Sequence, residues 1–229
     1  MTIRAVLFDL DNTLTHRDHS IDVYSQHFVT AYQQYLNHVD VQHIQSIIRS
    51  IDQGGYPQKE HLSHPSIAAS VGYALQQQLN WNHVPELEEL TQFWFQQFGL
   101  AAVAMSGAEQ LLIELKQQGY QLAVVSNGGH ATRLKILQGL GFQHYFDCII
   151  SSETAGISKP HPEIFHYSSR QLNLPIENCL FVGDHPVNDI QGATNAGMQA
   201  LWLEGFHIPA QQPLYRIQNL AQIRQFLSF

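Results

Sequence analysis

The chain has 229 residues, of which 44% are hydrophobic and only 13% are charged, with a formal net charge of −8. A chain of this length and apolar content can bury a substantial core, either as one large domain or as a domain with an insertion. The 11 basic residues are scattered, which argues against a nucleic-acid or acidic-membrane surface, because either needs clustered positive charge. The apolar runs are far shorter than the roughly 20 residues that span a bilayer.

The N-terminal segment and the cysteines favour a cytoplasmic location. Residues 1–9 contain one arginine and a short apolar run that ends in an acid, which does not match a signal peptide. Cys148 and Cys179 each lie in an apolar run that reads as a strand. We therefore expect buried free thiols in a reducing compartment rather than a disulfide.

The predicted elements begin with a buried parallel strand over residues 3–8, which is rich in β-forming residues and ends at Asp9. Four amphipathic helical patterns follow, over 21–35, 41–51, 67–75 and 87–98, with no strand pattern between them. Residues 16–97 are therefore predicted to form a small helical bundle that is inserted after the first strand.

From about residue 106 onward, helical and strand patterns alternate. We expect helices over 108–115, 134–140, 162–172, 187–196 and 217–226, and strands over 121–125, 148–150, 179–182 and 200–203. This alternation is typical of an α/β fold, a doubly wound parallel sheet of Rossmann-like type with helices on both faces. The expected core domain comprises residues 1–15 and 98–229, and the expected helical domain comprises residues 16–97.

Polar residues stand directly after three of the predicted strands. In doubly wound sheets, ligands bind beyond the carboxyl ends of the strands. The residues at these ends are Asp9, Asp11 and Thr13 after the first strand, Ser126 and Asn127 after the second, and Gly183 and Asp184 after the fourth.

Several acids would share this edge of the sheet. The spacing of Asp9 and Asp11 directs both carboxylates to the same side, although an isolated Asp-Leu-Asp can also form a turn. Asp189 can also act simply by complementing a helix dipole. Converging carboxylates repel one another unless a cation or a proton intervenes. Because the available ligands are oxygens, the sequence predicts Mg²⁺.

Lysine is scarce, and one lysine differs from the others. Lys116 and Lys135 lie in predicted helices, where we expect them to be solvated. Lys159 precedes Pro160, which holds it extended at the entrance to a helix. A cation there can bind a substrate phosphate and balance the carboxylates.

Four segments in order resemble the motifs of the haloacid dehalogenase-like (HAD) hydrolase superfamily. They are Asp9-Leu10-Asp11-Asn12-Thr13-Leu14, Ser126-Asn127-Gly128, Lys159-Pro160, and Gly183-Asp184 with Asp189. The helical insertion stands where the first subfamily carries its C1-type cap. The resemblance implies a Rossmann-like HAD core with a helical cap, in the phosphatase branch.

The resemblance also implies a role for each matched residue. Asp9 would be the nucleophile and Asp11 the general acid and base. Ser126 and the backbone of Asn127 would bind phosphate, and Lys159 would steady phosphate and nucleophile together. Magnesium would be held by Asp9, the Asp11 carbonyl, Asp184 and Asp189, the last directly or through water, with Thr13 and Gly183 in supporting positions.

The implied enzyme is a phosphoric monoester hydrolase that works through an aspartyl phosphate. The acid at position 11 argues against dehalogenation, because the dehalogenases of the superfamily lack it. The Ser-Asn-Gly form of the second motif is similar to that of pyrimidine nucleotidases and flavin mononucleotide (FMN) phosphatases. This favours a nucleoside monophosphate or an FMN-like compound as the small soluble substrate. Phosphoglycolate and sugar-phosphate phosphatases, and phosphomutases of the same superfamily, remain as alternatives.

The non-enzyme alternative is a phospho-accepting receiver module, which also uses an Asp, Mg²⁺ and a Lys in a doubly wound fold. Receivers have adjacent acids after the first strand and no helical insertion, so the pattern favours the enzyme. The expected partner is a small phosphate ester, with neither nucleic acid nor membrane, and no oligomeric state is predicted. His185, beside Asp184, is a further candidate for the site.

Overall fold

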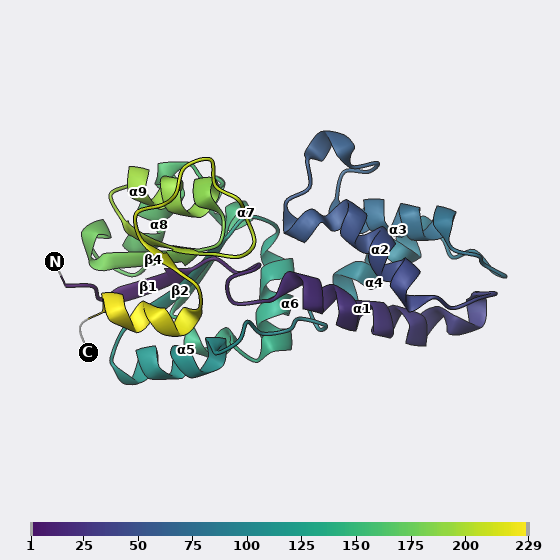
Figure 1. The fold of residues 1–229 in the computed structure, drawn as a ribbon, viewed down its shortest axis with the longest axis horizontal. Coiled ribbons are helices and arrows are strands. Elements are labelled where there is room, and N and C mark those ends of the chain that lie inside the picture. The colour runs from purple at the N-terminus through teal and green to yellow at the C-terminus, as the bar shows by residue number, and fades with distance from the viewer. Residues whose placement is uncertain (1, 228–229) are drawn as a thin grey trace. The chain divides into compact units, whose positions relative to one another are not determined.

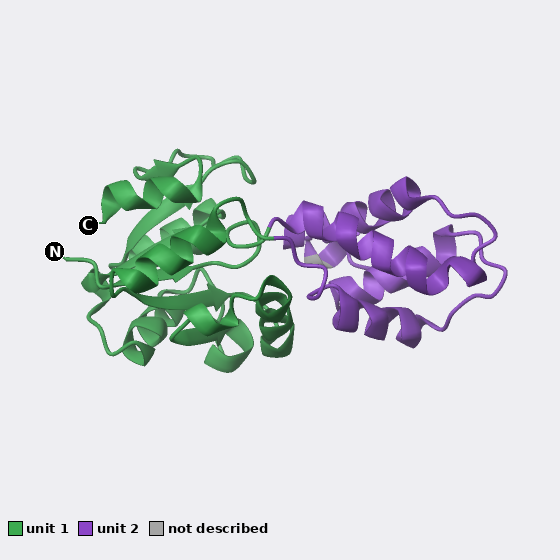
Figure 2. Cartoon of the chain, turned by 90° about the horizontal axis from the view of Figure 1, so that it is seen from below, with its two compact units in different colours: residues 1–15, 104–229 green, residues 16–103 purple. Residues whose placement is uncertain are grey.

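The computed structural model describes residues 2–227 and divides the chain into two compact units. Unit 1 comprises residues 1–15 and 104–229, and unit 2 comprises residues 16–103; Figure 2 colours them separately. Unit 2 ends at 103 rather than at the predicted 97, because Phe98 and Ala101 are buried in its hydrophobic cluster.

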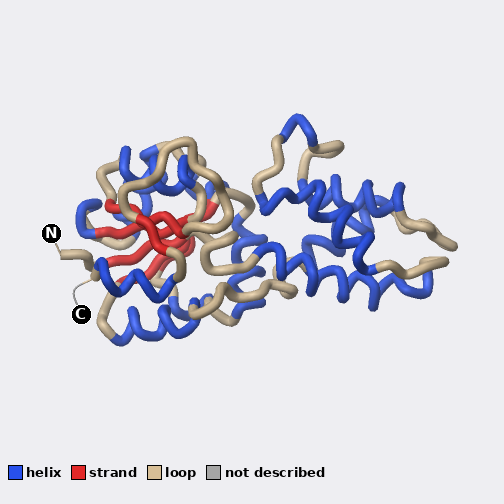
Figure 3. The backbone as a smooth tube through the Cα atoms, in the orientation of Figure 1, coloured by secondary structure: helices blue, strands red, loops and turns tan. Residues whose placement is uncertain are grey.

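Unit 1 is built on a parallel sheet, whose strands are red in Figure 3. The strand order is β3-β2-β1-β4-β5-β6. The strands are β1 Ala5–Phe8, β2 Gln121–Ser126, β3 Cys148–Ser151, β4 Cys179–Gly183, β5 Gln199–Leu203 and β6 Arg216–Ile217. Within the sheet, Ala5 of β1 pairs with Gln121 of β2 on one side and with Cys179 of β4 on the other. The strand order therefore reverses at β1, which places the expected ligand site at its carboxyl end.

Helices cover both faces of the sheet. Figure 1 shows α8 and α9 on one face and α5 with the C-terminal turn on the other. On the first face, Ala5 and Leu7 of β1 share a buried cluster with Ile164 and Phe165 of α8. Covered faces explain why β1 is a continuous apolar run. The helical elements of unit 1 are α5 Ala108–Gln117, α6 His130–Leu140, α7 Ser152–Ala155, α8 Pro162–Gln171, α9 Gly192–Asn195, the 3₁₀ turns η4 Gln143–Tyr145, η5 Ile176–Asn178 and η7 Leu220–Phe226, and the π-helical turn η6 Pro186–Gln191.

Two predicted helices are wrong in form. The segment 187–196 is the π-helical turn η6 followed by the short α9, with the carbonyl of His185 accepting from the amides of Asp189 and Ile190. The segment 217–226 begins in β6 and continues as the 3₁₀ turn η7. Its first residue joins the sheet because the amide of Glu204 donates to the carbonyl of Ile217 at 2.9 Å.

Unit 2 contains the four predicted helices, as α1 Arg17–Tyr32, α2 Val41–Asp52, α3 Ile67–Gln78 and α4 Leu87–Gln97, with 3₁₀ turns η1 Gln33–Tyr35, η2 Gln53–Gly55 and η3 Lys59–His61. Asp40 and Ser66 cap α2 and α3 by accepting from backbone amides. The core is aromatic, with Tyr24 and Phe28 of α1 beside Trp94 of α4. Among residues 2–227, no helix combines the length and hydrophobicity needed to cross a membrane.

A buried ion pair joins the start of α1 to the end of α2. Arg17 donates to both carboxylate oxygens of Asp52, at 2.8 and 2.6 Å. The Asp52 side chain is fully buried and that of Arg17 is 5% exposed. The guanidinium also lies 4.8 Å from the ring centroid of Phe98. The buried guanidinium of Arg17 therefore holds together the start of α1, the end of α2 and Phe98 near the end of unit 2.

We expect Asp52→Ala to lower the free energy of unfolding of unit 2 by about 3–5 kcal/mol, because it removes the carboxylate that holds the buried Arg17 guanidinium through two short hydrogen bonds. Urea denaturation of the full chain, followed by circular dichroism, measures the loss. Arg49→Ala is the control, since it removes exposed ion pairs with Asp18 and Asp22 and should cost less than about 1 kcal/mol. Equal losses in the two variants would contradict a special role for the buried pair.

Candidate active site

The carboxyl ends of β1, β2 and β4 bring the predicted polar residues to one edge of the sheet. Asp9 follows β1, and its amide extends the pairing with β4 by donating to the carbonyl of Val182 at 2.9 Å. Ser126 ends β2, and Asp184 follows β4. All three side chains are buried, with at most 2% of each residue exposed. Because the strands are parallel neighbours, they bring residues that are far apart in the sequence into one cluster.

Lys159 lies at the centre of this cluster. Its ammonium donates to Asp9 Oδ1 at 2.6 Å and to Asp189 Oδ1 at 2.7 Å. It also lies 5.3 Å from the ring centroid of Phe181, within reach of a cation–π contact. Burial lowers the pKa of Lys159, but the attraction of Asp189 and Asp9 outweighs burial and raises the pKa to about 12. The lysine is therefore a permanent buried cation.

The side chain of Asn127 holds the backbone of Lys159. Its amide nitrogen donates to the Lys159 carbonyl at 2.9 Å, and its oxygen accepts from the Lys159 amide at 2.8 Å. This pair of bonds ties the end of β2 to the loop before α8. Asn127 thus positions the lysine through its side chain, in addition to the backbone role that the sequence suggested.

Three buried carboxylates lie together at this edge, and two of them, Asp9 and Asp189, contact the lysine. One ligand atom each of Asp9, Asp184 and Asp189 lies within 4.8 Å of the others. Burial, against the attraction of Lys159, raises the pKa of Asp9 to about 6. Burial also raises the pKa of Asp184 and of Asp189. One ammonium does not balance three carboxylates, so the cluster favours the uptake of a further positive charge.

The donor atoms of the cluster fit a hard divalent cation. Asp9 Oδ2 is buried and has no hydrogen-bond partner among the described residues. Both oxygens of Asp189 are engaged, Oδ1 by Lys159 and Oδ2 by the amide of His185 at 2.9 Å. The carboxylates are all-oxygen ligands of the kind that Mg²⁺ prefers. Asp9 is thus free to ligate, whereas Asp189 is already held by protein groups.

Gly183 is required by the close approach of Asp189. A Cβ atom at position 183 would clash with the Asp189 carboxyl group. The π-helical turn η6 brings Asp189 back beneath the end of β4, and π-type turns occur often at functional sites. The glycine of the fourth motif therefore makes room for an acid that follows it in sequence.

Asp11 and Asp9 have different hydrogen-bond partners. Its Oδ2 accepts from Arg133 Nη1 at 2.6 Å, and the same nitrogen donates to Ser126 Oγ at 3.2 Å. Asp11 and Arg133 are each 8% exposed. The sequence interpretation did not single out Arg133, which lies in the first turns of α6. The sequence did offer one signal for it. Arg133 lies near the start of the helix that follows the Ser126-Asn127-Gly128 motif, and the start of a helix is a common place for binding an anion such as phosphate.

Thr13 lies in the tight turn after β1. The carbonyl of Leu10 accepts from the amides of Thr13, Leu14 and Thr15, at 3.4, 3.0 and 3.0 Å. Thr13 is fully buried, and its hydroxyl has no hydrogen-bond partner among the described residues. The turn is therefore closed by backbone bonds around Leu10, and the threonine packs within it.

Two histidines lie beside the carboxylates. Nδ1 of His185 accepts from the amides of Val187 and Asn188, at 3.2 and 3.1 Å, and so caps η6. Burial lowers the pKa of His185 to about 4. Nε2 of His207 lies 3.1 Å from Asp184 Oδ2. His207 belongs to no sequence motif, so sequence reasoning missed it.

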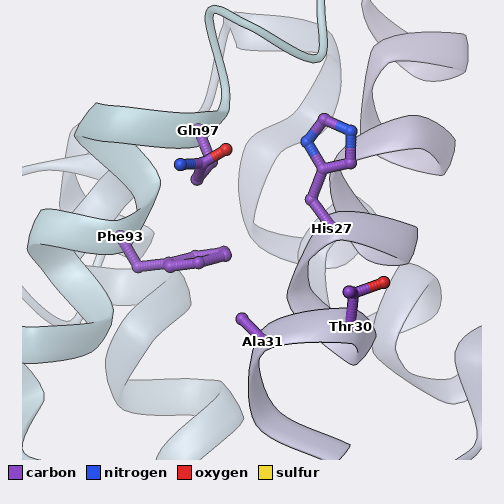
Figure 4. Close-up of a pocket in the computed structure, with 5 residues that line it drawn as sticks. All are labelled: His27, Thr30, Ala31, Phe93 and Gln97. Atoms are coloured by element: carbon purple, nitrogen blue, oxygen red, sulfur yellow. The ribbon is translucent and has the colours of Figure 1, made fainter.

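A separate pocket of about 320 Å³ lies within unit 2, between α1 and α4 (Figure 4). Its lining residues are His27, Thr30, Ala31, Phe93 and Gln97. They include neither a carboxylate nor a lysine. The groups suited to phosphate chemistry are therefore those at the sheet edge of unit 1.

Comparison with known proteins agrees with this geometry. A family model described as haloacid dehalogenase-like hydrolase matches residues 3–197. The chain is 34% identical to glyceraldehyde 3-phosphate phosphatase of Pyrococcus abyssi over 43% of this chain and 41% of that protein. It is 34% identical to phosphoserine phosphatase of Thermus thermophilus, over 51% and 48%. It is 31% identical to pyrimidine 5'-nucleotidase YjjG of Escherichia coli, over 54% and 56%.

These matches span only about half the length of the curated relatives. Solved structures match over nearly the whole chain. YfnB of Bacillus subtilis, solved bound to magnesium, has a TM-score of 0.73 at 22% identity and full coverage of both chains. L-2-haloacid dehalogenase of Xanthobacter autotrophicus has a TM-score of 0.70 at 18% identity, with 98% of each chain covered. At these identities the likeness shows the fold alone.

The four sequence motifs all lie within the matched residues 3–197, which make up most of the chain. This protein therefore belongs to the haloacid dehalogenase-like hydrolase family.

Proposed function

We propose that this protein is a Mg²⁺-dependent phosphate-monoester hydrolase that transfers the phosphoryl group of a small soluble metabolite to Asp9. The observation that carries the proposal is the environment of Asp9 at the end of the central strand. One carboxylate oxygen is held by the buried ammonium of Lys159, and the other has no hydrogen-bond partner among residues 2–227. A buried carboxylate oriented in this way is suited to nucleophilic attack.

The proposed reaction has two displacements. In the first, a carboxylate oxygen of Asp9 forms a bond to phosphorus while the bond to the leaving oxygen breaks, and Asp11 donates a proton to that oxygen. In the second, Asp11 takes a proton from water, which attacks phosphorus and releases Asp9. Lys159 orients Asp9 and offsets charge on the phosphoryl group. A bound Mg²⁺ would supply further charge neutralisation, with Asp9, Asp184 and the Asp11 carbonyl as its proposed ligands.

Arg133 extends the proposed phosphate site. Its guanidinium joins Asp11 to Ser126, the residues assigned to the leaving oxygen and to phosphate. Incoming phosphoryl oxygens would share this guanidinium with Asp11, and charge-assisted bonds of this kind are stronger than neutral ones. Asp189, whose oxygens are already engaged, would act mainly by holding Lys159.

The choice between chemistries within the family depends on Asp11. Both phosphatases and dehalogenases share this fold, so the fold does not separate them. The acid at position 11 favours phosphate hydrolysis, because it can protonate a leaving oxygen. The named relatives act on glyceraldehyde 3-phosphate, phosphoserine, phosphoglycolate and pyrimidine nucleotides. Small phosphate esters are their common class.

Within that class, the Ser126-Asn127-Gly128 motif favours a nucleoside monophosphate or an FMN-like substrate. Phosphoglycolate, sugar phosphates and a phosphomutase reaction are the alternatives. We further propose that unit 2 is the cap that selects the leaving group. A cytoplasmic location is supported by Cys148 and Cys179, which are unpaired and lie on strands that are not neighbours.

A panel of phosphate esters tests the function directly. With Mg²⁺, the purified protein should release inorganic phosphate from at least one small ester, and from an aryl phosphate. Dialysis against EDTA should abolish release, and added Mg²⁺ should restore it, because the carboxylates of the cluster need a cation. Full activity in EDTA would contradict the metal assignment, and no hydrolysis of any ester would contradict the function.

The two acids of the first motif should behave differently. Asp9→Asn should remove turnover, because an amide cannot form an acyl phosphate. Asp11→Asn should still release a burst of nitrophenol, a good leaving group, and should retain acid-labile phosphate on the protein, since hydrolysis lacks its base. Stopped-flow absorbance and phosphate analysis of the denatured protein measure both. Phosphate trapped on Asp9→Asn but never on Asp11→Asn would reverse the roles.

Lys159 should be the lysine on which activity depends. Lys159→Ala should lower kcat/KM by at least about a hundredfold, because a buried cation beside the phosphoryl group is worth several kcal/mol. Lys116→Ala is the matched control, since Lys116 forms a half-exposed ion pair with Asp147 and should leave kcat/KM within about twofold, as for a weak surface pair. Similar losses in the two variants would argue against the site. Circular dichroism checks that both fold.

A further inference from the structure

One nitrogen of Arg133 serves both Asp11 and the residue proposed to bind phosphate. Arg133 lies in the first turn of α6, where its amide donates to the carbonyl of Gly129 at 3.2 Å. Its Nη1 donates to Asp11 Oδ2 at 2.6 Å and to Ser126 Oγ at 3.2 Å. Because this nitrogen carries only two hydrogens, both are already engaged. Phosphoryl oxygens and Asp11 would therefore compete for Nη1.

The guanidinium of Arg133 lies against the backbone of Gly128. A Cβ atom at position 128 would stand 3.1 Å from Nη2 and 3.2 Å from Cζ of the arginine. Gly128 also has a φ of 131°, which favours glycine. Nε of Arg133 is buried and has no hydrogen-bond partner among residues 2–227. A phosphoryl group at Ser126 would thus meet the guanidinium from the side of Nη1, where Asp11 is bonded.

The ion pair between Arg133 and Asp11 is desolvated but rests on a single contact. The two side chains are only 10% and 11% exposed. Among the residues that the structure describes, one hydrogen bond joins them, from Nη1 to Oδ2. A phosphoryl group offers several oxygens and can form two parallel bonds to a guanidinium, which are stronger than one. Phosphate is therefore the better partner for Arg133 once it lies at Ser126.

We propose that Arg133 exchanges Asp11 for the phosphoryl group of the substrate, and that this exchange delivers Asp11 to the leaving oxygen. The inference rests on the proposed function, in which Asp11 serves that oxygen. While Oδ2 of Asp11 is bonded to Arg133, it is occupied. A ligand whose anionic group takes over the guanidinium releases Oδ2, whereas a ligand without such a group leaves the pair intact. Arg133 is thus a specificity-determining residue that selects for the phosphoryl group.

The test measures the binding of inorganic phosphate to the full chain by calorimetric titration in the presence of Mg²⁺. Asp11→Asn should bind phosphate at least about fivefold more tightly than the wild type, because the buried guanidinium loses its counter-ion. Arg133→Gln should bind it at least about tenfold more weakly, because the charge-assisted bonds are lost. Circular dichroism checks that both fold, and a gain of affinity cannot come from a misfolded chain.

Two further variants separate ion-pair exchange from a general effect of charge. Glu153 also lies near the start of α6, where it accepts from the amide of His130 at 2.7 Å, and it forms no hydrogen bond with Arg133 among the described residues. Glu153→Gln should change phosphate affinity by less than about twofold. When Arg133→Gln is already present, Asp11→Asn should also gain less than about twofold, because no guanidinium remains to be released.

The exchange is overturned if Asp11→Asn binds phosphate no more tightly than the wild type. It is also overturned if the gain persists undiminished in the Arg133→Gln background, since the gain would then reflect simple repulsion between Asp11 and phosphate. A wild-type protein that neither binds phosphate nor hydrolyses any ester would instead refute the proposed function.

Discussion

The geometry of the site depends on the ion pairs that the buried ammonium of Lys159 forms with Asp9 and Asp189. Isolated charges in a protein interior cost several kcal/mol each, so Asp9 and Asp189 tolerate burial because the lysine lies between them. The surrounding structure serves this arrangement. Asn127 holds the backbone of the lysine, and Gly183 leaves room for Asp189. Lys159 thereby connects the segments that follow β1, β2 and β4, through Asp9, Asn127 and Asp189.

The lysine does not complete the electrostatic balance. Asp184 adds a third buried carboxylate, and burial raises the pKa of Asp9 to about 6 although Lys159 opposes it. A further positive charge would lower the raised pKa of Asp9 and so favour the ionised form that the proposed reaction uses. A divalent cation would supply that charge, and an imidazole and a guanidinium group already border the carboxylates at this edge of the sheet.

The two units have separate cores, and this separation has functional consequences. Unit 2 is held by its aromatic cluster and by the buried pair of Arg17 and Asp52. Unit 1 is held by the sheet and its covering helices. Substitutions in the core of unit 2 therefore need not disturb the carboxylate cluster of unit 1. Phosphatases and dehalogenases share this fold at low identity, so chemistry resides in a few side chains at the strand ends.

Local patterns in the sequence determined the strand β1 that ends at Asp9, the parallel sheet and the helices of unit 2, because hydrophobic periodicity reports which face of an element is buried. They also indicated that Asp9, Lys159, Asp184 and Asp189 meet, since parallel strands end at one edge. Only the tertiary structure decided which side chains pair there. Arg133 meets Asp11 across 122 positions, and His207 reaches Asp184 from a loop without a motif. These pairs arise from the packing of segments that are far apart in the sequence, and local periodicity carries no information about such packing. The same holds for Ile217, which lies in strand β6 because it pairs with the segment after β5.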